Sequence, residues 1–353
     1  MSDLNLIDGL VKWKCPSNIA LIKYWGKFGE QFPQNPSISF TLNNCHTITS
    51  IHFTAKKESE SQIIFNFEGK QNEKFEEKVS KFIRGLYKRM PVLATLDLVI
   101  NSENSFPHST GIASSASAMG ALALCLVQIE QKVFDLKISK EDFFRKASIL
   151  ARLGSGSASR SVFPIMAEWG YTNYLENATN DYATPCENII HPIFHNFQDC
   201  ILIADSAEKS VSSRAGHSLM ENNPYAPIRY QEANDRFGKI LEALKNGDIE
   251  SFGELAEAEA LTLHALMMAS NPPYILMRPN TLVMIQLIQE YRKTRKVPLY
   301  FTLDAGPNIH LLYPESIRAE IEEFIRTDLV KYCENGSYIL DNVGDGPVDL
   351  IHH

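Results

Sequence analysis

The sequence predicts two domains, each of which combines helices and strands. The chain has 353 residues, which is too long for one small core and corresponds to about two domains. Strand-like segments dominate the start of the chain, whereas long helical runs dominate its second half. A polar stretch interrupted by Pro185 and Pro192 precedes a strand-like run from Ile201 to Ala204. We therefore place the boundary near residues 185–200 and expect domains at residues 1–190 and 191–353.

The first half is predicted to run from strands to a helix and back to a strand. Residues 48–55 and 63–67 mix β-branched and aromatic residues, and the second of these runs ends at a turn-like glycine. Apolar residues recur at helical spacing over 74–89, and Leu96, Leu98 and Ile100 then alternate as in a half-buried strand.

Two further helices are expected before the middle of the chain. The run Ser115 to Gln131 is rich in alanine and apolar nearly all round, which predicts a helix buried on every side. Ser139 followed by Asp142 predicts a helix start. That helix is expected to run to Leu153, and Gly154 suits its C-terminal end.

The second half is predicted to be rich in helices, with one hairpin. Helical periodicity covers residues 228–245, 249–268 and roughly 280–293. Two strand-like runs, 299–303 and 309–313, flank a turn that contains Asp304, Gly306 and Pro307.

Composition and charge exclude several classes of partner. The net charge of −8 argues against nucleic acid or an anionic membrane as the main partner. The six cysteines are scattered without a C-x-x-C pair, so neither a zinc site nor a disulfide framework is predicted. The densest apolar run, Ala121 to Val127, is too short for a bilayer span. These features favour a cytoplasmic protein with no membrane partner.

Four separated segments carry the residues that suggest chemistry. Each segment alone has an ordinary structural explanation. In chain order these explanations are a solvated strand end for 16–27, a capped helix for 110–117, a flexible linker for 154–161 and a hairpin turn for 304–308. Together they offer lysines, glycine- and serine-rich turns that can present N–H groups to anions, an arginine fork and a carboxylate. This combination predicts an enzyme that handles phosphate. The segments are Pro16 to Lys27, Thr110 to Ser117, Gly154 to Ser161 and Asp304 to Asn308.

Other catalytic patterns do not fit the chain. The serine-rich turn before Ser117 is neither a Walker loop nor a G-x-G-x-x-G fingerprint. His108, His217 and His264 lack the spacing of metal ligands, so we expect them to be structural or peripheral. The absence of G-x-S-x-G disfavours a serine hydrolase.

The four segments, in this order, resemble those of the diphosphomevalonate decarboxylases of the GHMP kinase superfamily. Residues 18–27 are similar to the family's N-terminal signature and residues 111–117 to its ATP-phosphate loop. Residues 154–161 are similar to its substrate loop, and residues 304–308 to its catalytic turn. The resemblance implies a two-domain α+β fold, with an N-terminal ribosomal-protein-S5-like domain and a C-terminal ferredoxin-like α/β-sandwich domain. It also implies an active site in the cleft between them.

The resemblance further implies a reaction and roles for particular residues. Asp304 would take the proton of the substrate's C3 hydroxyl as that oxygen attacks the γ-phosphate of ATP, with Lys23 beside it. Departure of the 3-phosphate and loss of CO2 would then give isopentenyl diphosphate, and Arg160 would clamp the substrate. Implied substrate-binding residues are Asn18, Tyr24, Trp25, Gly26, Lys27, Ser155, Gly156, Ser157, Ser159 and Ser212. Implied ATP-binding residues are Gly111, Ala113, Ser114, Ser115 and Ser117.

The implied cofactors and partners follow from the same resemblance. ATP would bind with Mg²⁺, which phosphate oxygens and waters would hold, so no protein metal ligand is expected. The substrate would be mevalonate diphosphate, and the chain would form a homodimer. Two departures from the family pattern stand out, the polar run 108–110 before the ATP loop and the run 162–164 after the substrate loop.

Three alternative functions remain open at this stage. The chain could decarboxylate mevalonate monophosphate, since no arginine in the helix predicted over 74–89 obviously matches one that animal and fungal members use on the substrate phosphates. It could be a GHMP kinase that stops after phosphorylation, or a ligand-binding relative without catalysis.

Overall fold

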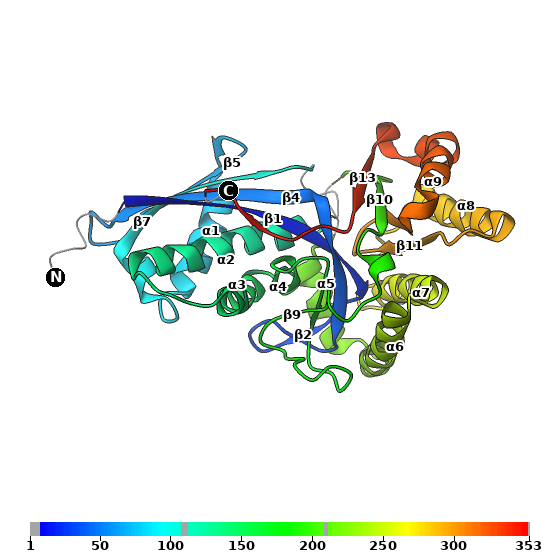
Figure 1. Cartoon of the computed structure of the whole chain (residues 1–353), viewed down its shortest axis with the longest axis horizontal. Coiled ribbons are helices and arrows are strands. Elements are labelled where there is room, and N and C mark those ends of the chain that lie inside the picture. Colours follow the sequence, from blue (N-terminus) through cyan, green and yellow to red (C-terminus); the bar gives the residue numbers. More distant parts are fainter. Residues whose placement is uncertain (1–7, 107–111, 208–210, 352–353) are drawn as a thin grey trace.

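The computed structural model describes residues 8–106, 112–207 and 211–351. It contains two main sheets, each packed against helices, and so has the mixed helix and strand composition that the sequence predicts (Figure 1). The first sheet and helices α1 to α3 lie on the left of Figure 1, and the second sheet lies on the right with α8 and α9 outside it. Among the described residues, no helix has the length and apolar character needed to cross a membrane.

The first sheet has eight strands within the described residues, in the order β14-β1-β4-β7-β5-β6, with β8 on β4 and β9 on β8. Most neighbours pair antiparallel, but β5 and β7 are parallel. A separate small hairpin consists of β2 (Lys27–Phe28) and β3 (Phe32–Pro33). The strands of the sheet are β1 (Asp8–Ile22), β4 (Ser37–Ala55), β5 (Ile63–Phe67), β6 (Lys70–Gln71), β7 (Leu96–Asn104), β8 (Met166–Trp169), β9 (Thr184–Pro185) and β14 (Val348–Asp349).

In the part of the chain that the structure describes, the second sheet has four antiparallel strands in the order β11-β12-β10-β13. Strands β11 and β12 form the predicted hairpin around Asp304. The chain then returns to the first sheet, where β14 pairs with β1 near the C-terminus (Figure 1). The strands are β10 (Gln198–Leu202), β11 (Tyr300–Leu303), β12 (Ile309–Tyr313) and β13 (Tyr338–Asn342).

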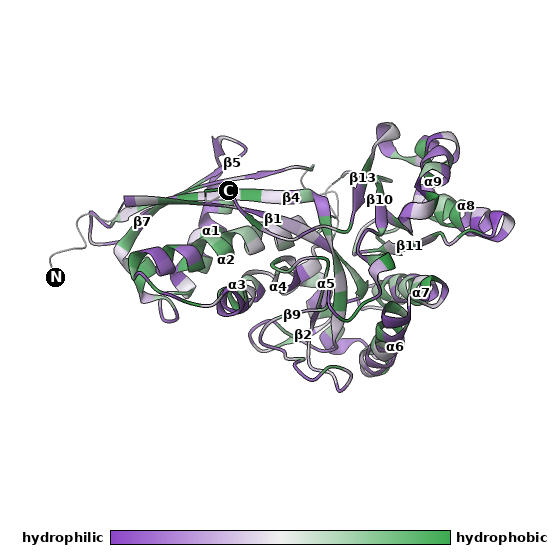
Figure 2. Cartoon of the chain, viewed as in Figure 1, coloured by the Kyte–Doolittle hydropathy of each residue, from purple (hydrophilic) through white to green (hydrophobic). Residues whose placement is uncertain are grey.

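The predicted helices are all present, with shifts of a few residues at some ends. Helix α3 begins after the Ser139 cap, whose hydroxyl accepts from the Asp142 N–H as expected. Figure 2 shows both hydrophilic and hydrophobic residues on the outer helices, which is typical of amphipathic helices. The helices are α1 (Glu73–Gly85), α2 (Ser114–Val133), α3 (Lys140–Gly154), α4 (Ala158–Ser161), α5 (Ser213–Leu219), α6 (Ala226–Asn246), α7 (Ile249–Met268), α8 (Pro279–Arg295) and α9 (Arg318–Phe324).

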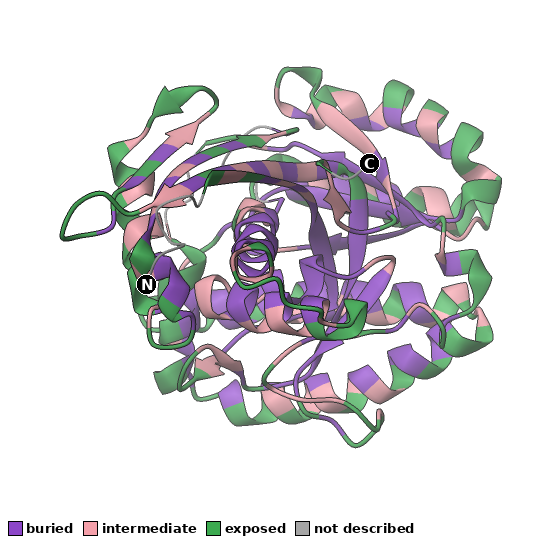
Figure 3. Cartoon of the chain, turned by 60° about the vertical axis from the view of Figure 1, so that its left-hand side comes forward, coloured by how far each residue is buried: buried purple, intermediate pink, exposed green. Residues whose placement is uncertain are grey.

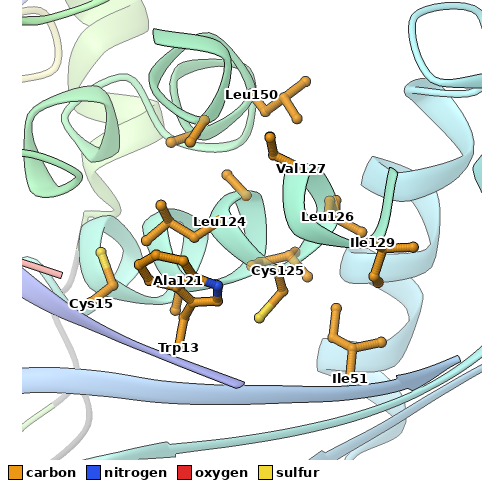
Figure 4. Close-up of a cluster of buried hydrophobic side chains, with 14 of the residues drawn as sticks. Trp13, Cys15, Ile51, Ala121, Leu124, Cys125, Leu126, Val127, Ile129 and Leu150 are labelled. Atoms are coloured by element: carbon orange, nitrogen blue, oxygen red, sulfur yellow. The ribbon is translucent and has the colours of Figure 1, made fainter. Parts of the chain in front are cut away.

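Helix α2 lies at the centre of the first core, as its all-round apolar sequence predicts. Ala121, Leu124 and Cys125 are fully buried, and Figure 4 shows Trp13 of β1 and Ile51 of β4 pointing toward this helix. Figure 3 shows the buried residues gathered in the interior, while the outward faces of the peripheral helices are exposed. The N-terminus of α2 is therefore fixed by packing along the helix.

The long strands β1 and β4 also contribute to a second core. Ile19 and Leu21 of β1 and Phe40 of β4 belong to the same buried cluster as Phe237 of α6 and Phe252 of α7. One strand thus packs on α2 near its start and on the C-terminal helices near its end. This arrangement brings the end of β1 close to the hairpin that carries Asp304.

Three predicted boundaries are wrong by several residues. Strand β4 begins at Ser37 rather than at residue 48, because buried polar residues such as Ser39 and Thr41 near its start carry no apolar signal. Helix α1 ends at Gly85 rather than Arg89, because glycine is a poor helix former and allows the chain to turn. Strand β10 begins at Gln198 rather than Ile201. Its early residues are polar but buried, and Asp199 is paired with His310 at 2.7 Å, so an apolar pattern could not reveal them.

Candidate active site

Lys23 and Asp304 meet although 281 positions separate them in the chain. Lys23 directly follows β1, and Asp304 directly follows β11. The Lys23 Nζ donates to Asp304 Oδ1 at 2.9 Å and to the Ala20 carbonyl at 2.6 Å. The lysine is 2% exposed, whereas the Asp304 side chain is 26% exposed. The pair therefore has a buried cation and a carboxylate that solvent or a substrate can reach.

The pairing offsets the cost of burying the lysine. Burial lowers the pKa of the Lys23 ammonium, while the Asp304 carboxylate beside it acts in the opposite direction. Breaking such a pair by removing one partner leaves an uncompensated buried charge. Asp304 thus favours the charged form of Lys23 at the end of β1.

The turn that carries Asp304 is held by side chains of α7 and α8 and by its own Asn308. Asn308 Oδ1 accepts from the Ala204 N–H at 2.8 Å, and Thr281 of α8 donates to the Pro307 carbonyl at 2.6 Å. The Asp304 carbonyl accepts from His264 Nε2 of α7 at 3.1 Å and from the Gly306 N–H at 2.7 Å. The carboxylate is therefore presented from a backbone that is bonded on several sides.

Arg160 lies in the short helix α4 and is 1% exposed. Its guanidinium donates to Ser39 Oγ at 2.9 Å and to Ser37 Oγ, and weakly to Asn18 Oδ1 at 3.4 Å. Burial lowers the pKa of Arg160 to about 10, and Asp304 opposes that shift. The arginine thus stays charged at pH 7, and its fork is oriented by two serines of β4.

The segment that begins at Ser155 folds against the end of β1. Asn18 Nδ2 donates to the Ser157 carbonyl at 3.1 Å and to Ser161 Oγ at 2.8 Å. The buried Ser159 hydroxyl donates to the Gly156 carbonyl at 2.8 Å. At Gly156, a Cβ would lie 2.8 Å from Tyr24 Oη, so this close approach requires glycine. The alternative interpretation of this segment as a flexible linker is wrong, because residues 158–161 form helix α4 and are buried.

Aromatic rings form the part of the site next to this segment. Tyr24 packs against Trp169 and His217, with ring centroids 4.8 and 4.5 Å away. Trp25 also packs against His217, with the ring centroids 4.6 Å apart. The Tyr24 hydroxyl is buried and has no hydrogen-bond partner among the described residues. Such an orphaned hydroxyl fits a polar ligand group.

After this aromatic pair, Gly26 is buried and Lys27 is half-buried. Gly26 has φ +99°, which favours glycine, and its N–H donates to His217 Nδ1 at 3.0 Å. Lys27 Nζ donates to Gln31 Oε1 at 2.9 Å. Burial lowers the pKa of Lys27, and the positive charge of the nearby Arg214 lowers it further. Ser212 caps α5 by accepting from the Ala215 N–H. Its hydroxyl therefore has a structural partner in addition to its predicted substrate contact.

The predicted ATP loop leads directly into α2. Ala113 has a left-handed conformation, φ 44°, at the start of the helix, and Ser114 is the first helical residue. Ser115 Oγ lies 3.3 Å from Ser155 Oγ, so the two predicted loops adjoin. Ser117 is fully buried and bonded to Thr47 Oγ1 at 2.7 Å. Gly111 and the departures at 108–110 lie outside the described residues.

The start of α2 has groups that suit a nucleotide phosphate. The N-terminus of the 20-residue helix α2 offers N–H groups and the hydroxyls of Ser114 and Ser115. Among residues 8–106, 112–207 and 211–351, no group of three acidic, histidine or cysteine side chains could hold a metal. A magnesium ion that accompanies a nucleotide commonly keeps several waters and binds phosphate oxygens.

Sequence reasoning missed several residues that support the site. Ser37 and Ser39 orient Arg160, and no pattern in β4 distinguishes them from other strand serines. His217 and His264 were expected to be structural or peripheral. Both have structural contacts within the site, because His217 packs on Tyr24 and His264 donates to the Asp304 carbonyl. A histidine within an otherwise apolar helical run is the one signal that could have identified His264.

We predict that His217 makes stability depend on pH. Burial lowers its pKa to about 3, whereas an unfolded histidine titrates near about 6.5. Below that pH the unfolded chain takes up a proton that the native chain does not, so the free energy of unfolding falls as pH falls. His217→Asn keeps an acceptor for the Gly26 N–H without titrating. Between pH 7.5 and 5, wild type should lose roughly 2 kcal/mol more than the variant in urea unfolding. Equal losses would show that His217 is not held neutral.

Family comparisons cover both halves of the chain. Residues 15–180 match the model of the diphosphomevalonate decarboxylase-like N-terminal domain. Residues 200–344 match that of the mevalonate 5-diphosphate decarboxylase C-terminal domain.

Individual relatives extend this similarity over most of the chain. A diphosphomevalonate decarboxylase of Debaryomyces hansenii is 28% identical, covering 87% of this chain and 80% of the relative. A phosphomevalonate decarboxylase of Haloferax volcanii is 26% identical, covering 86% of this chain and 88% of the relative.

Solved structures show the same fold. Mevalonate diphosphate decarboxylase of Staphylococcus aureus has a TM-score of 0.84 and 30% identity, covering 98% of this chain and 99% of that chain. MDDEF in complex with MVAPP, AMPPCP and magnesium has a TM-score of 0.81 and 29% identity, with coverage of 98% and 99%. The predicted two-domain GHMP-kinase-like fold is confirmed, and the chain belongs to the diphosphomevalonate decarboxylase family.

Proposed function

We infer that this chain catalyses the ATP-dependent decarboxylation of (R)-5-diphosphomevalonate to isopentenyl diphosphate, CO2, ADP and phosphate. The observation that carries this function is the 2.9 Å contact between Lys23 Nζ and Asp304 Oδ1, with an accessible carboxylate on a bonded turn. The activity agrees with that of the family to which the chain belongs.

Asp304 serves as the base in this proposal. It accepts the proton of the C3 hydroxyl as that oxygen attacks the γ-phosphate of ATP, and Lys23 orients the carboxylate and balances charge around it. The chain's own part in the transfer is positioning and charge neutralisation. Magnesium would travel with ATP and neutralise charge on the phosphates.

Arg160 serves as the clamp for the substrate. After the 3-phosphate leaves, positive charge develops at C3, and the carboxylate must be aligned so that its C–C bond breaks before water reacts. A guanidinium fixed by Ser37 and Ser39 suits this bidentate grip.

We propose the remaining site roles from position and chemistry. Tyr24, Lys27, Ser155 and Ser157 hold the diphosphate and carboxylate ends, and Ser212 positions the substrate. The buried, unpaired Tyr24 hydroxyl supports its role. The other proposed substrate contacts are Asn18, Trp25, Gly26, Gly156 and Ser159, and the proposed ATP contacts are Gly111, Ala113, Ser114, Ser115 and Ser117.

We also propose a homodimer that acts in the cytoplasm, with domains at residues 1–190 and 191–353. The family matches at 15–180 and 200–344 support a division between these segments. ATP and magnesium are the proposed cofactor pair, supported by the AMPPCP and magnesium of the MDDEF complex.

A second candidate is decarboxylation of mevalonate 5-monophosphate. It is supported by the phosphomevalonate decarboxylase of Haloferax volcanii, which is only slightly less similar than the diphosphomevalonate enzyme of Debaryomyces hansenii. A comparison of kcat/KM for the two substrates separates the candidates, because the second phosphate adds charge that Lys27 and Arg160 can neutralise.

The first functional prediction concerns coupling. With ATP, Mg²⁺ and mevalonate diphosphate, purified protein should release ADP and CO2 in equal amounts, because phosphorylation here only creates a leaving group. ADP without CO2, from mevalonate or either of its 5-phosphorylated forms, would instead identify a GHMP kinase.

The second prediction concerns the base. Asp304→Asn keeps the shape of the side chain but cannot accept the hydroxyl proton, so turnover should fall by roughly 10²–10⁴-fold. Substrate binding, measured by calorimetry, and the circular dichroism spectrum should stay close to wild type. Near wild-type turnover in the folded variant would exclude Asp304 as the base.

The third prediction concerns the clamp. Arg160→Lys keeps charge but loses the planar fork that Ser37 and Ser39 orient, so its kcat/KM should be no better than that of Arg160→Gln. Both variants are compared after their folding has been checked by thermal melting. If the lysine variant matches wild type, Arg160 contributes charge alone.

A further inference from the structure

Helix α7 is bonded to both members of the catalytic pair. Glu259 Oε2 accepts from the backbone N–H of Lys23 at 3.0 Å. His264 Nε2 donates to the backbone carbonyl of Asp304 at 3.1 Å. One helix therefore contacts the end of β1 and the turn after β11, which belong to different sheets.

The Glu259 carboxylate is the centre of a buried network. It is fully buried and accepts from Arg229 Nη1 at 2.9 Å, Arg229 Nη2 at 2.6 Å and Arg236 Nη1 at 2.9 Å. Together with the Lys23 N–H, it receives four hydrogen bonds. A buried carboxylate with this number of donors has little freedom to move.

The same network fixes the other side of the Lys23 peptide. The Lys23 carbonyl accepts from Asn35 Nδ2 at 3.0 Å and from Arg229 Nη2 at 3.3 Å. Glu259 and Arg229 thus hold both the N–H and the carbonyl of Lys23. The ammonium can then reach Asp304 from a backbone that is itself fixed.

The spacing on α7 suits a rigid link between the two partners. Glu259 and His264 are five residues apart, which corresponds to about 7.5 Å along a helix and about 140° around it. Two side chains at that angle can reach two different neighbours, here β1 and the hairpin turn. Because an α-helix is stiff along its axis, the distance between the contacts made by Glu259 and His264 is fixed.

A neighbouring carboxylate on the same helix shows what a purely structural ion pair looks like. Glu257 is 7% exposed and pairs with Arg292 at 2.6 Å, and it accepts from the Phe301 N–H at 3.2 Å. It combines an arginine and a backbone donor, as Glu259 does, and neither donor belongs to Lys23 or Asp304. Glu257 is therefore a matched control.

We propose that α7 sets the position of Lys23 against Asp304, with Glu259 and His264 as positioning residues. This inference rests on the proposed function. Neither residue is assigned a contact with substrate, and each acts through the backbone of a catalytic residue.

The main experiment compares Glu259→Gln with Glu257→Gln in the full chain. The rate is followed as ADP release, which reports phosphoryl transfer whether or not CO2 follows. Absence of CO2 from wild type would overturn the decarboxylase function and leave this test intact. We expect kcat of Glu259→Gln to fall about 10-fold or more with little change in KM, because small misplacements of catalytic groups are costly. Glu257→Gln should lose similar stability and keep kcat within about 2-fold of wild type.

A double-mutant cycle separates positioning from general destabilisation. In a Lys23→Met background, followed in single turnovers at high enzyme concentration, Glu259→Gln should cause less than about 2-fold further loss, since its effect passes through Lys23. A loss in that background equal to the loss in wild type would overturn the proposal. So would a kcat for Glu259→Gln equal to that of Glu257→Gln.

His264 provides the second test, and it decides the matter if Glu259→Gln does not fold. His264→Leu removes the donor to the Asp304 carbonyl, whereas His264→Gln can place an amide N–H near the position of Nε2. We expect the leucine variant to lose about 10-fold or more in kcat and the glutamine variant to recover most of it. Equal kcat values for the two variants would overturn the role of His264.

Discussion

The cost of burying one ammonium group organises much of this molecule. Lys23 is almost fully enclosed, so its charge must be paired inside the protein. Its partner comes from the other sheet, on a turn 281 positions later in the chain. The pair can form only when the first sheet, the second sheet and the helices between them are assembled. The site is therefore a product of the whole fold, and neither sheet alone supplies both charges.

Local sequence patterns predicted the elements well where one physical signal dominated. The apolar helix α2, the cap at Ser139 and the hairpin around Asp304 all lie where spacing and turn residues placed them. Prediction was poorer where polar residues are buried, as at the start of β10, because the Asp199–His310 pair hides the strand from any apolar pattern. Such pairs depend on contacts between distant segments, which local periodicity does not report.

The same limit applies to the site. Lys23, Arg160 and Asp304 could be identified from their segments and from the resemblance to a family, and the Lys23–Asp304 contact agrees with that expectation. The groups that orient them could not. Ser37 and Ser39 face Arg160 through the packing of α4 on β4, and Glu259 reaches Lys23 across 236 positions. A serine in a strand or a glutamate in a helix carries no local mark of such a partner.

Burial also influences which side chains of the site are charged and which are neutral. It raises the pKa of the Tyr24 hydroxyl and lowers that of His217, so both groups are neutral at pH 7. Lys23 has Asp304 to oppose the effect of burial, and Arg160 remains charged because its intrinsic pKa is high. Lys23 and Arg160, the two cations proposed to face the substrate's negative groups, thus lie beside the neutral rings of Tyr24 and His217. The charge of Arg160 itself lowers the pKa of Lys23, so further cations beside them would add to this repulsion. Neutral rings next to the two cations avoid that cost while leaving both charges available to an anion.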